Sequence, residues 1–124
     1  MLISSKKISL IAMVAIAGPF ASLSHAVEIF NEDFQDGNSN GWSMSGSGTN
    51  QVTVYSGNYS LRLTRQKQAQ QAIATTGYEN VSVSMEMAAS SLEGSDQCLG
   101  EVSTNGGSSW TTVVQVVNGQ DDGV

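Results

Sequence analysis

The sequence predicts an all-β fold, an antiparallel β-sandwich, and three observations lead to that prediction. Short segments rich in valine, isoleucine and threonine alternate between apolar and polar residues, the period-two pattern of a half-buried strand. Turn signals built from glycine, asparagine and serine recur about every ten residues, as they do in small sandwiches. Beyond residue 26, no segment shows the period of an amphipathic helix.

We expect residues 1–26 to be a signal peptide. Lys6 and Lys7 precede an apolar run, which Gly18-Pro19 ends, and Ser24-His25-Ala26 places small residues where a signal peptidase cleaves. The run is shorter than the roughly 20 apolar residues of a membrane-spanning helix. The protein is therefore expected to be secreted or periplasmic, with no membrane span after cleavage. The remaining domain, 27–124, has 124 − 26 = 98 residues.

The charge of this mature chain excludes several kinds of partner and chemistry. The full chain has 5 basic and 11 acidic side chains, and Lys6 and Lys7 leave with the signal peptide, so the mature charge is 3 − 11 = −8. A strongly acidic protein repels nucleic acid and anionic membrane surfaces. The single histidine, His25, also lies in the signal peptide. The mature chain therefore has no Ser–His or Cys–His catalysis and no imidazole ligand for zinc.

The first strands are expected at 27–34, 51–55 and 60–64. In the last of these, Leu61 and Leu63 share one face, which predicts that this face is buried. Residues 37–50 form a long polar loop with Trp42 in its middle. A loop of that length in so small a domain is expected to be functional or mobile.

The later strands are expected at 70–75, 80–88, 97–103 and 110–117. The clearest is 80–88, because four apolar residues alternate with polar ones, namely Val81, Val83, Met85 and Met87. The strand 110–117 ends in a dense valine run, typical of a strand in a sandwich core. Cys98 is the only cysteine, and we expect it to be structural. In an oxidising compartment, an odd cysteine indicates an intermolecular bridge, a free thiol or a partner outside this chain.

The most specific motif is Ser103-Thr104-Asn105-Gly106-Gly107-Ser108-Ser109-Trp110. Asn105 and Gly107 tolerate the left-handed backbone of a hairpin turn, over which the indole of Trp110 can pack. The spacing resembles an Asp-box, with asparagine in place of aspartate. The Asp-box is a structural element of several secreted β folds. The resemblance therefore implies a hairpin held by Ser103, Asn105, Gly107 and Trp110, and it does not imply an enzymatic activity.

A wider resemblance covers nearly the whole mature chain. Its segments are Glu32–Gly37, Gly41-Trp42, Ser60–Leu63, Gly77–Val83, Leu92–Asp96 and the Asp-box hairpin. They resemble the galactose-binding-like jelly-roll modules of secreted bacterial proteins, which include carbohydrate-binding modules, and they are similar to reelin repeats. The resemblance implies a jelly roll with a structural calcium, for which Glu32 and Asp33 match the ligand position.

Modules of this kind continue past the Asp-box strand, whereas this chain stops at Asp121-Asp122-Gly123-Val124. The resemblance therefore implies a C-terminally truncated chain that lacks the last strands and, with them, a cysteine to pair with Cys98. The alternative is a complete small sandwich with an odd cysteine.

The exposed aromatic residues suggest a function. Sugar rings present flat C–H faces on which aromatic side chains stack. Tyr55, Tyr59 and Tyr78 flank turns and are the candidate ligand-binding residues, although packing alone would also explain each of them. We therefore expect a secreted, non-catalytic module that binds a polysaccharide or glycan. Two alternatives remain open: a structural or adhesive accessory domain of a larger protein without a ligand of its own, and a glycoside hydrolase that uses two carboxylates.

Overall fold

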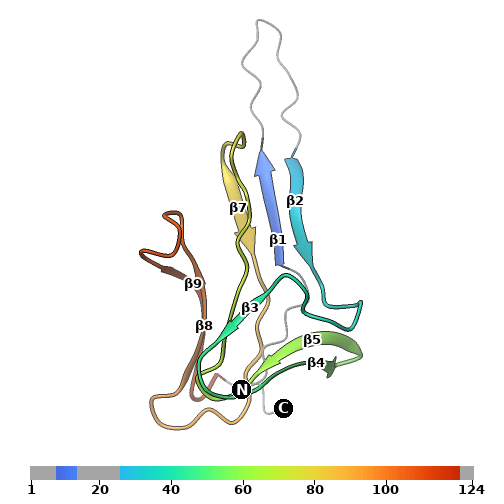
Figure 1. Ribbon diagram of the computed structural model, residues 1–124. Coiled ribbons are helices and arrows are strands. Elements are labelled where there is room, and N and C mark those ends of the chain that lie inside the picture. Colours follow the sequence, from blue (N-terminus) through green and yellow to red (C-terminus); the bar gives the residue numbers. More distant parts are fainter. Residues whose placement is uncertain (1–7, 14–25, 121–124) are drawn as a thin grey trace, which may run out of the picture.

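The computed structural model describes residues 8–13 and 26–120, and within them it contains strands and no helix. All strand pairs are antiparallel (Figure 1). The strands are β1 (Ile8–Met13), β2 (Ala26–Glu32), β3 (Ser43–Ser45), β4 (Asn50–Tyr55), β5 (Asn58–Leu63), β6 (Gln68–Gln70), β7 (Val81–Ser84), β8 (Gln97–Val102) and β9 (Thr111–Val117). The predicted all-β, antiparallel fold is confirmed. The sheets are small and unclosed, so the sandwich and the jelly roll remain predictions.

The largest sheet has the order β2-β1-β7, with β1 between the other two strands (Figure 1). β1 pairs with β2 from Ile8↔Glu32 to Met13↔Ala26, and Ile29 has no partner because the register shifts there. β1 belongs to the predicted signal peptide, in which no strand was expected. Ala26, the last residue of that predicted peptide, begins β2, whereas its residues 1–7 and 14–25 lie outside the described residues, as do residues 121–124.

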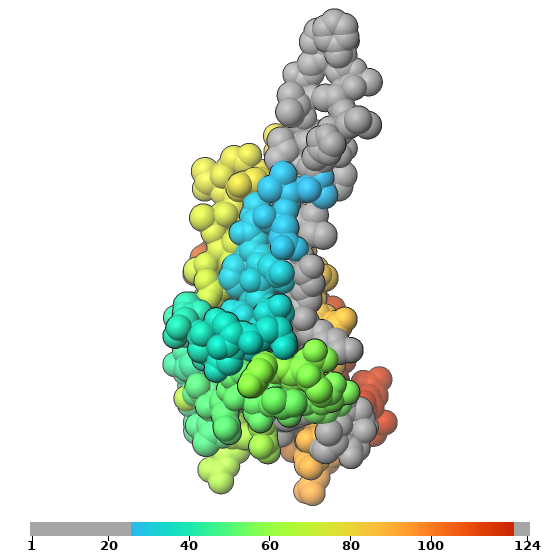
Figure 2. Space-filling view, turned by 90° about the vertical axis from the view of Figure 1, so that its right-hand side faces the viewer, coloured from blue at the N-terminus to red at the C-terminus, as the bar shows by residue number. Residues whose placement is uncertain are grey.

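A first apolar core forms where the loop after β2 meets the β4–β5 hairpin. Its buried members are Phe34, Leu61 and Leu63. The hairpin loop, Ser56-Gly57, has positive φ at both residues, 49° and 82°. This is the geometry of a two-residue type I′ turn, whose twist matches that of the flanking strands. In Figure 2, the β4–β5 hairpin and the segment after β2 form one continuous body, from which β2 extends.

Two short strands, β3 and β6, pair over three residues, from Ser43↔Gln70 to Ser45↔Gln68. Gly46 follows β3 with a φ of +76°, and its α-carbon lies so close to the Gln66 carbonyl oxygen that a Cβ would overlap it. Gly48 lies equally close to the Thr64 carbonyl. Glycine at these two positions therefore lets the chain after β3 pass directly against the chain before β6.

A second apolar core lies beside β8 and β9. Its buried residues are Ala89, Leu92 and Cys98, with Met87 and Val116 packed against them. Gly100 in β8 is also buried, and a Cβ there would overlap Met85 and Val114, so the absence of a side chain lets the segment after β7 lie on β8.

Several predicted strands are shorter than the sequence pattern indicated. β7 ends at Ser84 although the alternation continues to residue 88, and β6 covers 68–70 instead of 70–75. Residues 85–88 lack a strand partner, since Met85 meets β8 through its side chain at Gly100. Residues 71–75 contain two alanines, which are poor strand formers. The predicted loop 37–50 contains β3, because Met44 packs on the first core and brings its neighbours into register with β6.

Candidate functional site

A cavity of about 1790 Å³ opens between the two apolar cores. Its walls come from β2 and the loop after it, β5, the segment around β6, β7, β8 and the hairpin that follows β8. Pockets for small molecules typically enclose about 300–1,000 Å³. This cavity is larger and open, so it could take an extended, chain-like ligand rather than a compact one.

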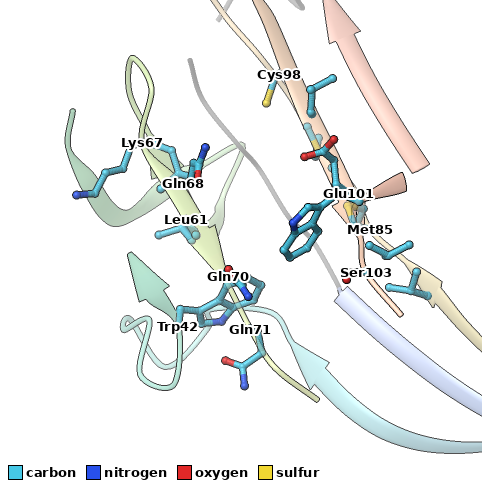
Figure 3. A pocket seen from close by; sticks show the side chains of 18 of the residues that line it. Trp42, Leu61, Lys67, Gln68, Gln70, Gln71, Met85, Cys98, Glu101 and Ser103 are labelled. Atoms are coloured by element: carbon cyan, nitrogen blue, oxygen red, sulfur yellow. The ribbon is translucent and has the colours of Figure 1, made fainter. Parts of the chain in front are cut away.

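One wall of the cavity carries a row of glutamines. Gln66, Gln68, Gln70 and Gln71 all line it. The β3–β6 register fixes this wall, because Gln70 pairs with Ser43, the residue after Trp42. In Figure 3, Gln70 and Gln71 lie beside Trp42, and Gln68 lies farther along the same wall beside Lys67. A carboxamide both donates and accepts hydrogen bonds, so this wall offers both kinds of group to a ligand.

Trp42 is the aromatic residue of that wall. Its Nε1 donates to Glu32 Oε2 at 3.3 Å, and its ring lies 5.8 Å from that of Phe34 and 6.4 Å from that of Phe30, centroid to centroid. Glu32 Oε1 also accepts the Phe34 backbone N–H at 2.7 Å. Phe34 has a φ of 57°, which is strained for a bulky residue. The Glu32 carboxylate thus fixes both the strained backbone and the indole.

The opposite wall is formed by β8 and its surroundings. Figure 3 shows Cys98, Glu101, Ser103 and Met85 on this side, across the cavity from Trp42 and Leu61. Glu101 Oε1 accepts the Thr112 hydroxyl at 3.3 Å. Cys98 is 1% exposed, and burial raises the pKa of its thiol to about 11, so the thiol is protonated at neutral pH. A neutral, buried thiol is a poor nucleophile, which is consistent with a structural role.

The Asp-box-like hairpin is held by hydrogen bonds among its own residues. Asn105 Oδ1 accepts the Ser109 backbone N–H at 2.9 Å, and Ser103 Oγ accepts the Gly107 N–H at 2.8 Å. Asn105 Nδ2 also donates to Ser109 Oγ at 2.8 Å. Trp110 lies against Gly107 in this turn, and 44% of the residue is exposed. Trp110 also lines the cavity.

The three tyrosines predicted to bind ligand do not line the cavity. Tyr55 and Tyr59 lie at the end of the β4–β5 hairpin, where Tyr59 is 40% exposed. Tyr78 is in the turn before β7 and is also exposed. They remain candidates for a separate surface. The sequence did not predict that Trp42 and Trp110 line a cavity, nor that the glutamines do, namely Gln66, Gln68, Gln70 and Gln71. The only available signal for the glutamines was their clustering at 66–71.

The predicted calcium ligands are already engaged. Both Glu32 oxygens accept N–H groups, and Asp33 Oδ1 accepts the Gln35 backbone N–H at 3.0 Å. Among residues 26–120, no three acidic, histidine or cysteine side chains gather as a metal site would require. Calcium prefers six to eight oxygen ligands, and these two carboxylates do not fit that need as they stand. Calcium binding stays a prediction of the resemblance.

Within the part of the chain that the structure covers, there is no apolar helix with the length of a membrane span. Comparisons were made with protein-family models, with curated protein sequences and with solved structures. None of the three gives a match to this chain.

Proposed function

We propose that the protein is a secreted, non-catalytic module that binds carbohydrate in the cavity between its two cores. The observation that carries the proposal is the wall on which Trp42 lies beside Gln70 and Gln71. An indole provides a flat apolar surface for sugar C–H groups, and carboxamides match the mixed donor and acceptor character of sugar hydroxyls. The open shape of the cavity favours a polysaccharide chain over a single sugar.

The charges of the cavity favour a neutral sugar. Arg65 and Lys67 line it together with the carboxylates of Glu86, Asp96 and Glu101, so neither sign dominates. Carboxylates in such a site would accept hydrogen bonds from sugar hydroxyls. A strongly anionic polymer would meet these carboxylates as well as the basic residues, and the acidic mature chain would repel it.

The experiment is affinity electrophoresis of the protein in gels that contain neutral polysaccharides, followed by titration calorimetry with oligosaccharides of any that retards it. The test variant is Gln70→Ala, because Gln70 is exposed and lines the cavity. The control is Gln115→Ala, since Gln115 is an exposed glutamine on β9 that does not line the cavity. We expect Gln70→Ala to weaken binding about tenfold, as the loss of one or two hydrogen bonds would, and Gln115→Ala to bind like the wild type.

Tyr59→Ala locates the site independently. If that variant loses binding and Gln70→Ala does not, the ligand binds at the β4–β5 hairpin and the cavity assignment is wrong. If a folded protein is retarded by no polysaccharide, the alternative of a structural or adhesive accessory domain without a ligand replaces the proposal.

A further inference from the structure

The central strand of the largest sheet comes from the segment that the sequence predicts to be removed. β1 pairs with β2 over residues 8–13 and with β7 over residues 9–12, whereas β2 and β7 pair with no other strand among the described residues (Figure 1). Neighbouring strands lie about 4.8 Å apart, so β2 and β7 are separated by about 10 Å and cannot hydrogen-bond to each other while β1 is between them. Cleavage after Ala26 would leave both with an unpaired edge.

The register of the three strands shows which side chains are favoured in a strand that lies between β2 and β7. Directly paired residues of antiparallel strands share a face of the sheet. Position 10 lies between Phe30 and Val83, and position 12 lies between Val27 and Val81, so this face is apolar on both sides. Positions 9 and 11 share the other face. Their partners there are Asn31, Ser84, Glu28 and Ser82, which are all polar.

The two strands thus specify an occupant with apolar residues at two alternate positions and polar residues between them. Leu10 and Ala12 meet this pattern, whereas Ile11 occupies a polar register position. Phe30, Val81 and Val83 of the apolar face line the cavity, as does Ser82 of the polar face, so the site borders the cavity. Backbone pairing on both sides would provide affinity, and the two apolar positions would provide specificity.

We propose that the position between β2 and β7 is a strand-acceptor site. Ile8–Met13 fills it before processing, and removal of the signal peptide opens it to an extended segment of a second polypeptide. That segment runs antiparallel to both strands, has no proline over about six residues, and alternates apolar with polar side chains. The site is independent of carbohydrate binding and rests on cleavage near Ala26.

The test displaces β1 within the full chain. Leu10→Lys places a charge at an apolar register position, and the matched control Ile11→Lys makes the same substitution at the next, polar position. The probe is a fluorescent synthetic peptide with the sequence of residues 6–14, and its binding is measured by fluorescence anisotropy. We expect the peptide to bind the Leu10→Lys chain at least tenfold more tightly than the wild-type or Ile11→Lys chain, in which β1 already fills the site.

Two further peptides test the register. A peptide with threonine in place of Ile11 should bind at least as well, and a peptide with lysine in place of Leu10 should not bind. Equal binding of these two peptides, or no binding of the parent peptide to a folded Leu10→Lys chain, would overturn the proposal.

Hydrogen exchange covers the case in which the Leu10→Lys chain does not fold. The protein is isolated after cleavage, with and without the peptide, and the backbone amides of residues 28–32 in β2 and 81–84 in β7 are followed. Protection that is lost on cleavage and restored by the peptide supports the site. Protection of these amides that is the same with and without the peptide overturns it. Polysaccharide binding, measured separately, reports on the glutamine wall and does not decide this question.

Discussion

Replacing Gly46 with alanine should destabilise the protein far more than replacing Gly37, although both residues have a φ of +76°. An L-residue in left-handed backbone costs about 1–2 kcal/mol, and this cost is common to both variants. The loss of unfolded-state entropy on changing glycine to alanine is also common to both. The pair therefore isolates the effect of the close approach between chains.

The additional cost at Gly46 follows from its surroundings. A Cβ at Gly37 would have no heavy atom within 4 Å, whereas at Gly46 it would overlap the Gln66 carbonyl oxygen. Because that oxygen belongs to the backbone, relief requires the β3–β6 ladder of three residue pairs to separate. Overpacking of this kind costs about 1–3 kcal/mol, so we expect a total loss of about 2–5 kcal/mol for Gly46→Ala against about 1–2 kcal/mol for Gly37→Ala.

The assay is urea unfolding of the wild type and both variants, followed by tryptophan fluorescence and far-ultraviolet circular dichroism. The expected difference between the two variants, about 1–3 kcal/mol in free energy of unfolding, corresponds to roughly 4–24 °C in Tm for a domain of this size. Losses of free energy of unfolding that agree within about 0.5 kcal/mol would refute the reasoning, because the two chains would then not lie in contact at Gly46.

Three other predictions follow from single contacts. Asn105→Ala removes the hydrogen bonds to Ser109 and should cost about 1–2 kcal/mol in urea unfolding, whereas Asn105→Asp, which keeps the accepting oxygen, should stay within about 0.5 kcal/mol of the wild type. The thiol of Cys98 ionises near pH 9.0 when unfolded and near pH 11 when folded. The free energy of unfolding is therefore unaffected by this thiol below pH 9, and it falls by at most about 3 kcal/mol between pH 9 and 11, because the unfolded state ionises first. Unfolding measured across that range should show a steeper loss for the wild type than for Cys98→Ala, and parallel curves would contradict the assignment. Calcium bound at Glu32 and Asp33 would raise Tm in millimolar calcium relative to chelator, and the difference would vanish in Glu32→Gln; identical melting curves for the wild type in both solutions would end the calcium hypothesis.

Local chemistry made parts of this fold predictable. The Ser56-Gly57 turn and the Asn105-to-Ser109 hairpin are specified by residues that are adjacent in sequence, so the motif was sufficient to place them. The alternation at 60–63 likewise predicted that Leu61 and Leu63 are buried, because a period-two pattern directly encodes the two faces of a strand.

The candidate site was less predictable because it depends on pairing between distant segments. Gln70 belongs to the cavity wall only because β6 pairs with β3, which is itself a three-residue strand inside a polar stretch. Tyr59, by contrast, is an aromatic residue beside a turn, as a sugar-binding residue would be, but it lies at a hairpin end and does not line the cavity. The apolar run at 8–13 satisfies the requirements of both a signal peptide and a strand, and one sequence cannot separate them.

The two apolar clusters described above share no residue, and a wide cavity opens between them. Cooperative unfolding depends on contacts that cross from one part of a domain to another, and few apolar contacts cross here. The region around Phe34 and the region around Cys98 should therefore open as separate cooperative units, each with its own free energy. Gly37 and Gly46 both belong to the first unit, whereas reaction of the Cys98 thiol reports on the second. A sugar chain that spans the cavity would touch both clusters and would join them into a single cooperative unit.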